Sequence, residues 1–328
     1  MRARVDDGNM TVSRPKPTLD LHTEEEDAEP GSDTTAVGDT TMRDVKANGV
    51  RLRVALSGSG PPVVLLHGLF THHGAWDAVI DEMSSEFRMI APDFPGFGES
   101  EKPRSSRFSY DVAAFTEVVA DLFAALDVGR AAVVGHALGG AVALTLAARH
   151  PELVSRLVLV DSVCFDAPVD LRRRVALLPL VGGFVLKQLW GRSTFRSFFR
   201  SNVLSNRPGY PLERIDRYYD KFDDPAARGS ALATLRATRD TRPIEALTAR
   251  VHAPTLVVWG RADRLVPARF GLRLSRSIRG AGFELMDTGH APHEERPAEF
   301  ASILGRFLRA QRPSGDRSGL SLGPAAVR

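Results

Sequence analysis

Residues 135–140 form the first stretch whose residue types and spacing point to chemistry. They read Gly-His-Ala-Leu-Gly-Gly, between an apolar run at 131–134 and an alanine-rich helical run at 141–150. A strand, a very tight turn and a helix are the context of the G-x-S-x-G nucleophile elbow, in which small neighbours let one strained residue project above a sheet. The elbow position holds Ala137, which has no hydroxyl, thiol or carboxylate. The sequence therefore predicts an elbow without its nucleophile.

Two later loops supply an acid and a base. Asp263 follows the apolar run at 255–259, and His290 stands in a glycine-flanked loop after the run at 283–286. A base that removes a proton needs a carboxylate to fix its tautomer and to stabilise the imidazolium that forms. Ligands of open α/β sheets bind at the carboxyl edge of the strands, so we expect Asp263 and His290 to meet there. Asp161 ends the run at 157–160 and is an alternative acid.

Regular alternation of strands and helices must position these loops. Such alternation indicates an α/β fold with a doubly wound, mostly parallel sheet. A hairpin around Asn48–Gly49 precedes it. The expected strands are 63–66, 88–91, 131–134, 157–160, 255–259 and 283–286, and the expected helices are 76–84, 110–126, 141–150, 268–278 and 294–309.

The alternation is interrupted once and is flanked by two tails. Residues 162–242 mix apolar and basic side chains at helical spacing, which predicts a helical cap insertion over the sheet. Residues 43–161 and 243–311 then form one core. Residues 1–42 are acidic and nearly free of aromatic side chains, and 312–328 are rich in Gly, Ser, Pro and Ala, so we expect a disordered tail and a flexible tail.

Charge and cysteine usage limit the classes of partner. The chain of 328 residues has a net charge of +3, while the insertion holds fifteen Lys and Arg against eight Asp and Glu. No nucleic-acid module accompanies these charges, so we expect no nucleic-acid partner, whereas the basic insertion allows peripheral contact with an anionic membrane surface.

The single cysteine, Cys164, excludes an intramolecular disulfide. No signal peptide is readable, and we expect a cytoplasmic monomer or homodimer.

Five motifs together resemble the α/β-hydrolase fold superfamily, in the branch that carries a helical cap. The resemblance spans residues 46–309, and its motifs are His67–Gly68 and the stretches 93–100, 135–140, 260–267 and 289–297. It implies a serine-hydrolase-type site with Ala137 at the nucleophile position, Asp263 as acid and His290 as base. It also implies an oxyanion hole formed by the backbone amides of Leu69, or alternatively Phe70, and of Leu138. No metal or organic cofactor is implied.

Apolar side chains around this site predict a small hydrophobic carbonyl substrate, such as an ester or a lactone. The predicted substrate-binding residues are Phe70, His136, Phe165 and Trp190, and His67 is expected to shape its own loop. Three interpretations of Ala137 remain open: an inactivated variant of a serine enzyme, a natural enzyme in which His290 and Asp263 act directly as a base, and a ligand-binding protein without activity. Direct base chemistry includes lyase or hydratase reactions as well as hydrolysis. Ser162 and Cys164 are weak candidates for a substitute nucleophile, since both follow a different strand.

Overall fold

The computed structural model describes residues 36–37, 40–165, 190–205 and 209–310. Its strands are β1 (Ala36–Val37), β2 (Thr40–Ala47), β3 (Val50–Ser57), β4 (Pro62–Leu66), β5 (Arg88–Pro92), β6 (Ala131–His136), β7 (Val154–Val160), β8 (Thr255–Gly260) and β9 (Gly282–Met286). Its α-helices are α1 (Asp77–Met83), α2 (Val112–Ala125), α3 (Leu138–Arg149), α6 (Arg192–Phe198), α7 (Leu212–Phe222), α8 (Pro225–Ala237), α9 (Arg242–Glu245), α10 (Arg269–Ser277), α11 (Pro292–Glu295) and α12 (Pro297–Arg309).

The strands form one sheet in the order β1-β2-β3-β5-β4-β6-β7-β8-β9. The pairs from β5 through β9 are parallel, and β1, β2 and β3 are added antiparallel at one edge. The chain runs from β4 outward to β5 and then returns to β6 on the other side of β4. The carboxyl ends of β4 and β6 therefore flank the point at which the strand order reverses, where open α/β sheets bind their ligands.

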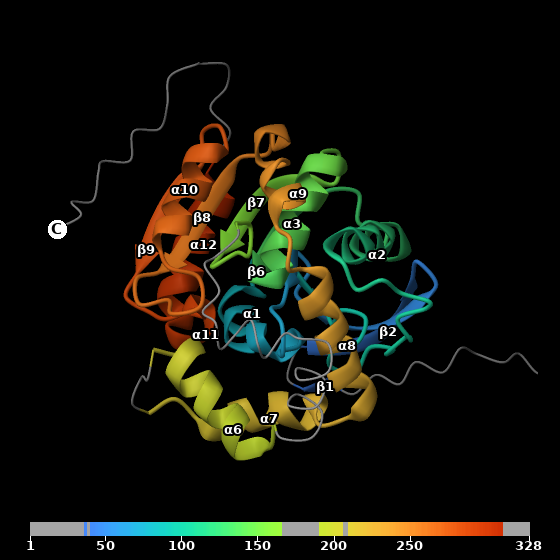
Figure 1. The fold of residues 1–328 in the computed structure, drawn as a ribbon. Coiled ribbons are helices and arrows are strands. Elements are labelled where there is room, and N and C mark those ends of the chain that lie inside the picture. Colours follow the sequence, from blue (N-terminus) through green and yellow to red (C-terminus); the bar gives the residue numbers. More distant parts are fainter. Residues whose placement is uncertain (1–35, 38–39, 166–189, 206–208, 311–328) are drawn as a thin grey trace, which may run out of the picture. The chain divides into compact units, whose positions relative to one another are not determined.

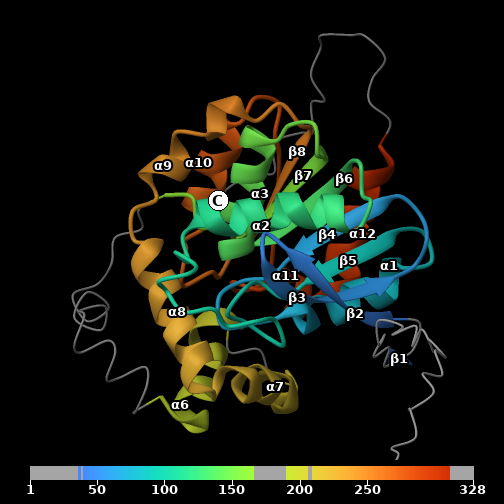
Figure 2. The same ribbon diagram turned by 90° about the vertical axis from the view of Figure 1, so that its right-hand side faces the viewer.

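Helices cover both faces of this sheet (Figures 1 and 2), as the alternation predicts. Helices α2 and α3 pack together on one face, and α1 and α12 pack together on the other. Each strand of the parallel part buries side chains toward both faces, because alternate residues belong to two separate apolar clusters. The predicted doubly wound sheet is confirmed.

The predicted element bounds are confirmed to within a few residues, with two corrections. Strand β2 already begins at Thr40, so the predicted acidic tail extends too far when it is drawn to residue 42. The single helix predicted over 294–309 is two helices, because the chain leaves the helical conformation at Arg296, where φ is −139°, before Pro297 starts α12. Residues 1–35 and 311–328 lie outside the described part of the chain. Most of the predicted disordered tail and all of the predicted flexible tail therefore stay predictions.

Helices α6, α7 and α8 occur between β7 and β8, within the stretch predicted to be a helical insertion, and Figure 1 shows them grouped together. Residues 166–189 of the insertion are outside the described residues. Aromatic side chains from α6, from the residue that follows it and from α7 are buried against each other, with Phe195 stacked on both Phe199 and Phe222. Among the described helices, we find none with both the length and the apolar character needed to cross a bilayer.

Candidate active site

The elbow between β6 and α3 has the strained backbone expected of a nucleophile position. Ala137 has φ 48° and ψ −108°, in the left-handed half of the backbone map that side-chain-bearing residues avoid. A Cβ placed on Gly139 would lie 2.2 Å from the Leu66 carbonyl oxygen, and one on Gly135 would lie 2.2 Å from the Gly139 oxygen. These glycines let α3 approach β4 and β6 closely, so the turn has the tight strand–turn–helix geometry that the sequence predicts for an elbow.

The peptide between Ala137 and Leu138 presents its N–H at the start of α3. The Ala137 carbonyl accepts hydrogen bonds from the amides of Gly140, Ala141 and Val163. Because the N–H of a trans peptide points opposite to its C=O, the Leu138 amide points away from this helix turn. It is also one of the first N–H groups of α3, which lack partners within the helix and favour negative charge.

The peptide between Gly68 and Leu69 is oriented in a similar way. The Gly68 carbonyl accepts from Thr71 Oγ1 at 3.0 Å and is bonded to His67 Nδ1 at 2.8 Å, which fixes the direction of the opposite Leu69 N–H. A Cβ on Gly68 would lie 3.4 Å from the Cβ of Ala137, so this loop lies against the elbow. The residue after Leu69, Phe70, has φ 67°. Both amides predicted for an oxyanion hole thus belong to peptides held in one orientation beside Ala137.

His290 and Asp263 form a buried pair. His290 Nδ1 lies 2.7 Å from Asp263 Oδ2, and the other carboxylate oxygen accepts from the amides of Leu265 and Val266 at 2.7 and 2.9 Å. Burial by itself would raise the pKa of Asp263, but the charge and hydrogen bond of His290, with the backbone amides, hold that pKa below its usual value. With Nδ1 engaged, Nε2 of His290 has no hydrogen-bond partner among the described residues and is the nitrogen left for chemistry.

Two more histidines hold the loops of the site together. His136, next to Ala137, places Nε2 2.7 Å from the carbonyl oxygen of His290, and burial lowers its pKa to about 3. His67 Nε2 accepts from the Phe94 amide at 2.9 Å, and burial lowers its pKa to about 4. Both rings are neutral at pH 7 and fix backbone positions. The expectation that His67 shapes its loop agrees with these contacts.

The insertion is fastened to the loop that carries His290. The His290 amide donates to the Val203 carbonyl at 2.7 Å, and Glu295 joins the two segments, since Oε1 accepts from the Gly289 amide at 2.6 Å and Oε2 from Ser205 Oγ at 2.8 Å. Such contacts make the position of the base depend on the position of the insertion.

The adjacent Glu294 continues this attachment. Its buried carboxylate accepts hydrogen bonds from the hydroxyls of Tyr210 and of Tyr218, the second at 2.7 Å, and Arg214 Nε lies 4.0 Å away. Burial raises the pKa of Glu294 in spite of these partners. We missed both glutamates in the sequence. The available signal was a pair of charged residues four and five positions after the predicted base, at the start of the helix predicted over 294–309.

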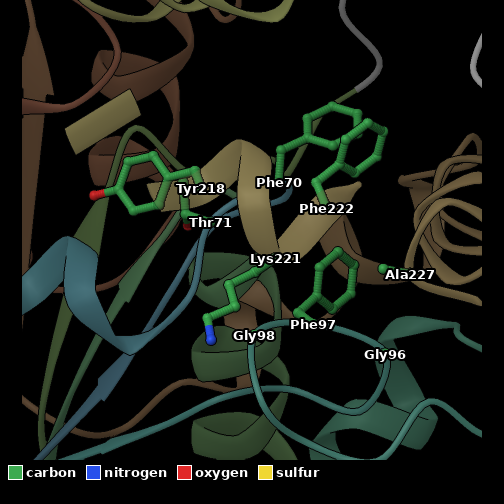
Figure 3. A pocket seen from close by; sticks show the side chains of 9 residues that line it. All are labelled: Phe70, Thr71, Gly96, Phe97, Gly98, Tyr218, Lys221, Phe222 and Ala227. Carbon is green, nitrogen blue, oxygen red and sulfur yellow. The ribbon is translucent and has the colours of Figure 1, made fainter. Parts of the chain in front are cut away.

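A pocket lies between the insertion and the loops after β4 and β5. It is lined by Phe70, Thr71, Gly96, Phe97, Gly98, Tyr218, Lys221, Phe222 and Ala227. Figure 3 shows the rings of Phe70 and Phe222 side by side, while Tyr218 turns its hydroxyl away from them. Four of the nine lining residues are aromatic, and one is a cation, Lys221, which is paired with Glu99 at 2.5 Å.

The four predicted substrate-binding residues occupy different places. Phe70 lines the pocket, and Trp190 packs edge-on against Phe70 with ring centroids 5.2 Å apart. Phe165 instead stacks near Phe270 and beneath the Arg273 guanidinium, outside the lining of this pocket. His136 is fully enclosed between loops and contributes hydrogen bonding and packing.

The other nucleophile candidates are buried. Ser162 Oγ lies against α3, where a Cβ on Gly140 would come within 1.9 Å of it. Cys164 is fully buried, and burial raises the pKa of its thiol, which favours the protonated and unreactive form. Asp161, the alternative acid, does not contact His290 through a hydrogen bond; the structure gives that contact to Asp263.

Two clusters bring three potential metal ligands within 4.8 Å of one another: His72 with His73 and Asp93, and Asp161 with Asp263 and His290. In the first, Asp93 Oδ1 already lies 2.8 Å from His73 Nδ1, and its Oδ2 accepts from the Glu99 amide at 2.8 Å. In the second, both oxygens of Asp263 are used by His290 and by backbone amides. The carboxylates of Asp93 and Asp263 are therefore already engaged in hydrogen bonds, and the absence of a metal stays a prediction.

Comparison with known proteins gives a consistent set of relatives. A family model described as the alpha/beta hydrolase fold matches residues 61–297. An uncharacterised protein of Mycobacterium tuberculosis is 31% identical over 85% of this chain and 84% of its own length. The 2-hydroxymuconate semialdehyde hydrolase of Pseudomonas sp. CF600 is 31% identical over 81% of this chain and 93% of its own. Among solved structures, the meta-cleavage product hydrolase of Pseudomonas fluorescens IP01, a serine-to-alanine mutant complexed with acetates, aligns with a TM-score of 0.70 and 25% identity, covering 81% and 97% of the two chains.

Proposed function

Because this chain belongs to the α/β hydrolase fold family, we propose that it hydrolyses a hydrophobic ester, lactone or related carbonyl compound by direct base catalysis from His290. The chain is an enzyme of the hydrolase class, and the proposal concerns its substrate and its mechanism. The observation that carries it is the intact His290–Asp263 pair beside an elbow that keeps its strained geometry with alanine.

The proposed reaction needs no covalent intermediate. A water molecule attacks the substrate carbonyl while His290 Nε2 accepts one of its protons, and Asp263 stabilises the resulting imidazolium. The carbonyl oxygen becomes an oxyanion that the amides of Leu69 and Leu138 stabilise. His290 then returns the proton to the leaving oxygen as the tetrahedral intermediate collapses, which restores the starting state and releases an acid and an alcohol.

Several features support a hydrophobic substrate with a reactive carbonyl. The pocket lining includes Phe70, the residue after Leu69, and three further aromatic side chains, which favour an apolar acyl or ring system. Triad enzymes that lose a triad member keep about 10³- to 10⁴-fold catalysis over water, so a serine-free site is best matched to an intrinsically labile substrate. Relatives named 2-hydroxymuconate semialdehyde hydrolase and 2-hydroxy-6-oxo-2,4-heptadienoate hydrolase point to conjugated carbonyl compounds as the first class to test.

The test is hydrolysis of an aryl ester series and of an enol lactone by the unmodified chain and by His290→Ala. We expect slow turnover that is lost in His290→Ala and kept in His252→Ala, which removes an exposed histidine from a different loop. Turnover that survives in His290→Ala would refute the proposed base. If no compound reacts with either protein, but several bind with thermal stabilisation, the chain is a ligand-binding protein and the proposal is wrong.

A further inference from the structure

Asp161 occupies an unusual position for a carboxylate. It follows β7 with φ 43°, is fully buried, and its Oδ1 accepts from the Gly260 amide at 3.0 Å. The other oxygen, Oδ2, is buried without a donor among the described residues. Buried carboxylate oxygens are normally hydrogen-bonded, so this oxygen requires an explanation.

The neighbouring groups show what faces Asp161. Ligand atoms of Asp161, Asp263 and His290 lie within 4.8 Å of one another. Asp263 comes from the loop after β8 and His290 from the loop after β9, and the carboxylate of Glu295 on α11 also adds negative charge nearby. Asp161 thus faces a second carboxylate that already accepts three hydrogen bonds, and the only cation-forming group of the cluster, His290, is bonded to Asp263 rather than to Asp161.

We propose that Asp161 is a positioning residue that stays protonated in the folded enzyme and donates its O–H to Asp263. A neutral carboxylic acid has one donor, which turns the unsatisfied contact between two acceptors into a hydrogen bond. It leaves Asp263 as the single ionised carboxylate facing His290, held on one side by the acid and on another by the amides of Leu265 and Val266. Two like charges in such a site cannot both be present at neutral pH, as in other carboxyl pairs that share a proton.

The electrostatics of the pair agree with this assignment. Burial, followed by the like charge of Asp263, raises the pKa of Asp161 well above its usual value, whereas the pKa of Asp263 is lowered. Opposite shifts of the two pKa values are the expected behaviour of two interacting acids in different environments.

The retained proton can be tested without any enzyme activity. Asp161→Asn places an amide where the neutral acid would be: Nδ2 can donate to Asp263, the amide oxygen can accept from Gly260, and asparagine tolerates positive φ. In the unmodified chain, the unfolded state loses the Asp161 proton above about pH 4 while the folded state keeps it. Unfolding is then favoured as the pH rises, relative to a variant that cannot titrate at this position.

We therefore expect the ratio of unfolding constants, unmodified chain over Asp161→Asn, to rise about tenfold per pH unit from pH 4.5 until the folded state itself releases the proton. Asp240→Asn is the control, because its exposed carboxylate is paired with Arg242 and its pKa is lowered to about 2. The ratio of unfolding constants of the unmodified chain and Asp240→Asn should be independent of pH above pH 5. A flat ratio for Asp161→Asn above pH 5 would overturn the proposal, since it would show an ionised Asp161 in the folded state.

The positioning role rests on the proposed function and is tested separately. We expect the downfield proton resonance of the His290–Asp263 hydrogen bond to be kept in Asp161→Asn and to be shifted or lost in Asp161→Ala. Turnover should be within about threefold of the unmodified chain in Asp161→Asn and should fall by tenfold or more in Asp161→Ala. If both variants keep the resonance and the turnover, Asp161 does not position the pair. If no protein turns over any compound, the proposed function fails, while the pH-dependent ratio and the resonance still decide the assignment of Asp161.

Discussion

The strained backbone at Ala137 can be measured as stability, and Ala137→Gly is the most direct perturbation. Glycine adopts φ 48° and ψ −108° without the steric conflict that Cβ introduces. A residue held in such a region costs of order 1–3 kcal/mol. Two effects oppose this gain in stability. Removing the buried methyl group lowers the free energy of unfolding by about 0.8 kcal/mol, and the greater backbone freedom of glycine in the unfolded state lowers it by about 0.4–1 kcal/mol. The net change in the free energy of unfolding should lie between a loss of about 1 kcal/mol and a gain of about 2 kcal/mol.

Ala143→Gly is the matched control, since Ala143 is a fully buried alanine inside the same helix, α3. Ala143→Gly removes the same methyl group and lowers helix propensity by about 1 kcal/mol, and it has no strain to release. The free energy of unfolding should therefore fall by about 2 kcal/mol. Urea denaturation of both variants gives the comparison. We expect Ala137→Gly to be more stable than Ala143→Gly by about 2 kcal/mol, which is the stored strain. Equal losses of stability in the two variants would show that the elbow is not strained.

Three further results are expected. Burial lowers the pKa of His67 to about 4, so the folded state takes up its proton only near that pH while the unfolded state does so near 6.5. His67 alone should therefore contribute a loss of stability of about 1.4 kcal/mol per pH unit as the pH falls from about 6.5 to 4, and His67→Gln should lessen the measured slope by that amount in urea titrations. Tyr218→Phe removes a hydroxyl donor from the buried Glu294, so it should lower the free energy of unfolding by about 1–3 kcal/mol and speed hydrogen exchange in 209–218 and 289–295 together; unchanged exchange in 289–295 would contradict the attachment of the insertion to the base. Phe222→Ala should enlarge the pocket and shift the preferred acyl chain to greater length in an aryl ester series, whereas Phe165→Ala, outside the pocket lining, should leave the preference unchanged.

The sequence was sufficient to predict those parts of the site that follow from local pattern. Residues 135–140 predict the elbow because small residues between a strand and a helix permit one close approach, and the structure has that approach at Gly135 and Gly139. The alternation of strands and helices places Asp263 and His290 at one edge of the sheet, where the two side chains meet. The positions of the predicted strands and of the hairpin at Asn48–Gly49 depend on the same local signals.

Other parts could not be predicted because they depend on contacts between distant segments. Glu294 is a surface residue by type, and only the approach of Tyr210 and Tyr218 from the insertion makes it a buried acceptor. Phe165 and Phe70 are equally apolar in sequence, but the fold places one against Phe270 and the other in the pocket lining. The choice between the two acids likewise required the structure, since each follows a strand of the same sheet.

The central claim is that His290 and Asp263 act directly on water at an elbow that lacks a nucleophile. The most direct measurement is a rapid-mixing experiment with an aryl ester, followed by intact-protein mass spectrometry, on the unmodified chain and on Ala137→Ser. We expect the unmodified chain to release product without a burst and without an added acyl mass, and Ala137→Ser to show both a burst and an acyl adduct. A burst or an acyl adduct on the unmodified chain would contradict the claim, because it would place a covalent nucleophile elsewhere in the protein.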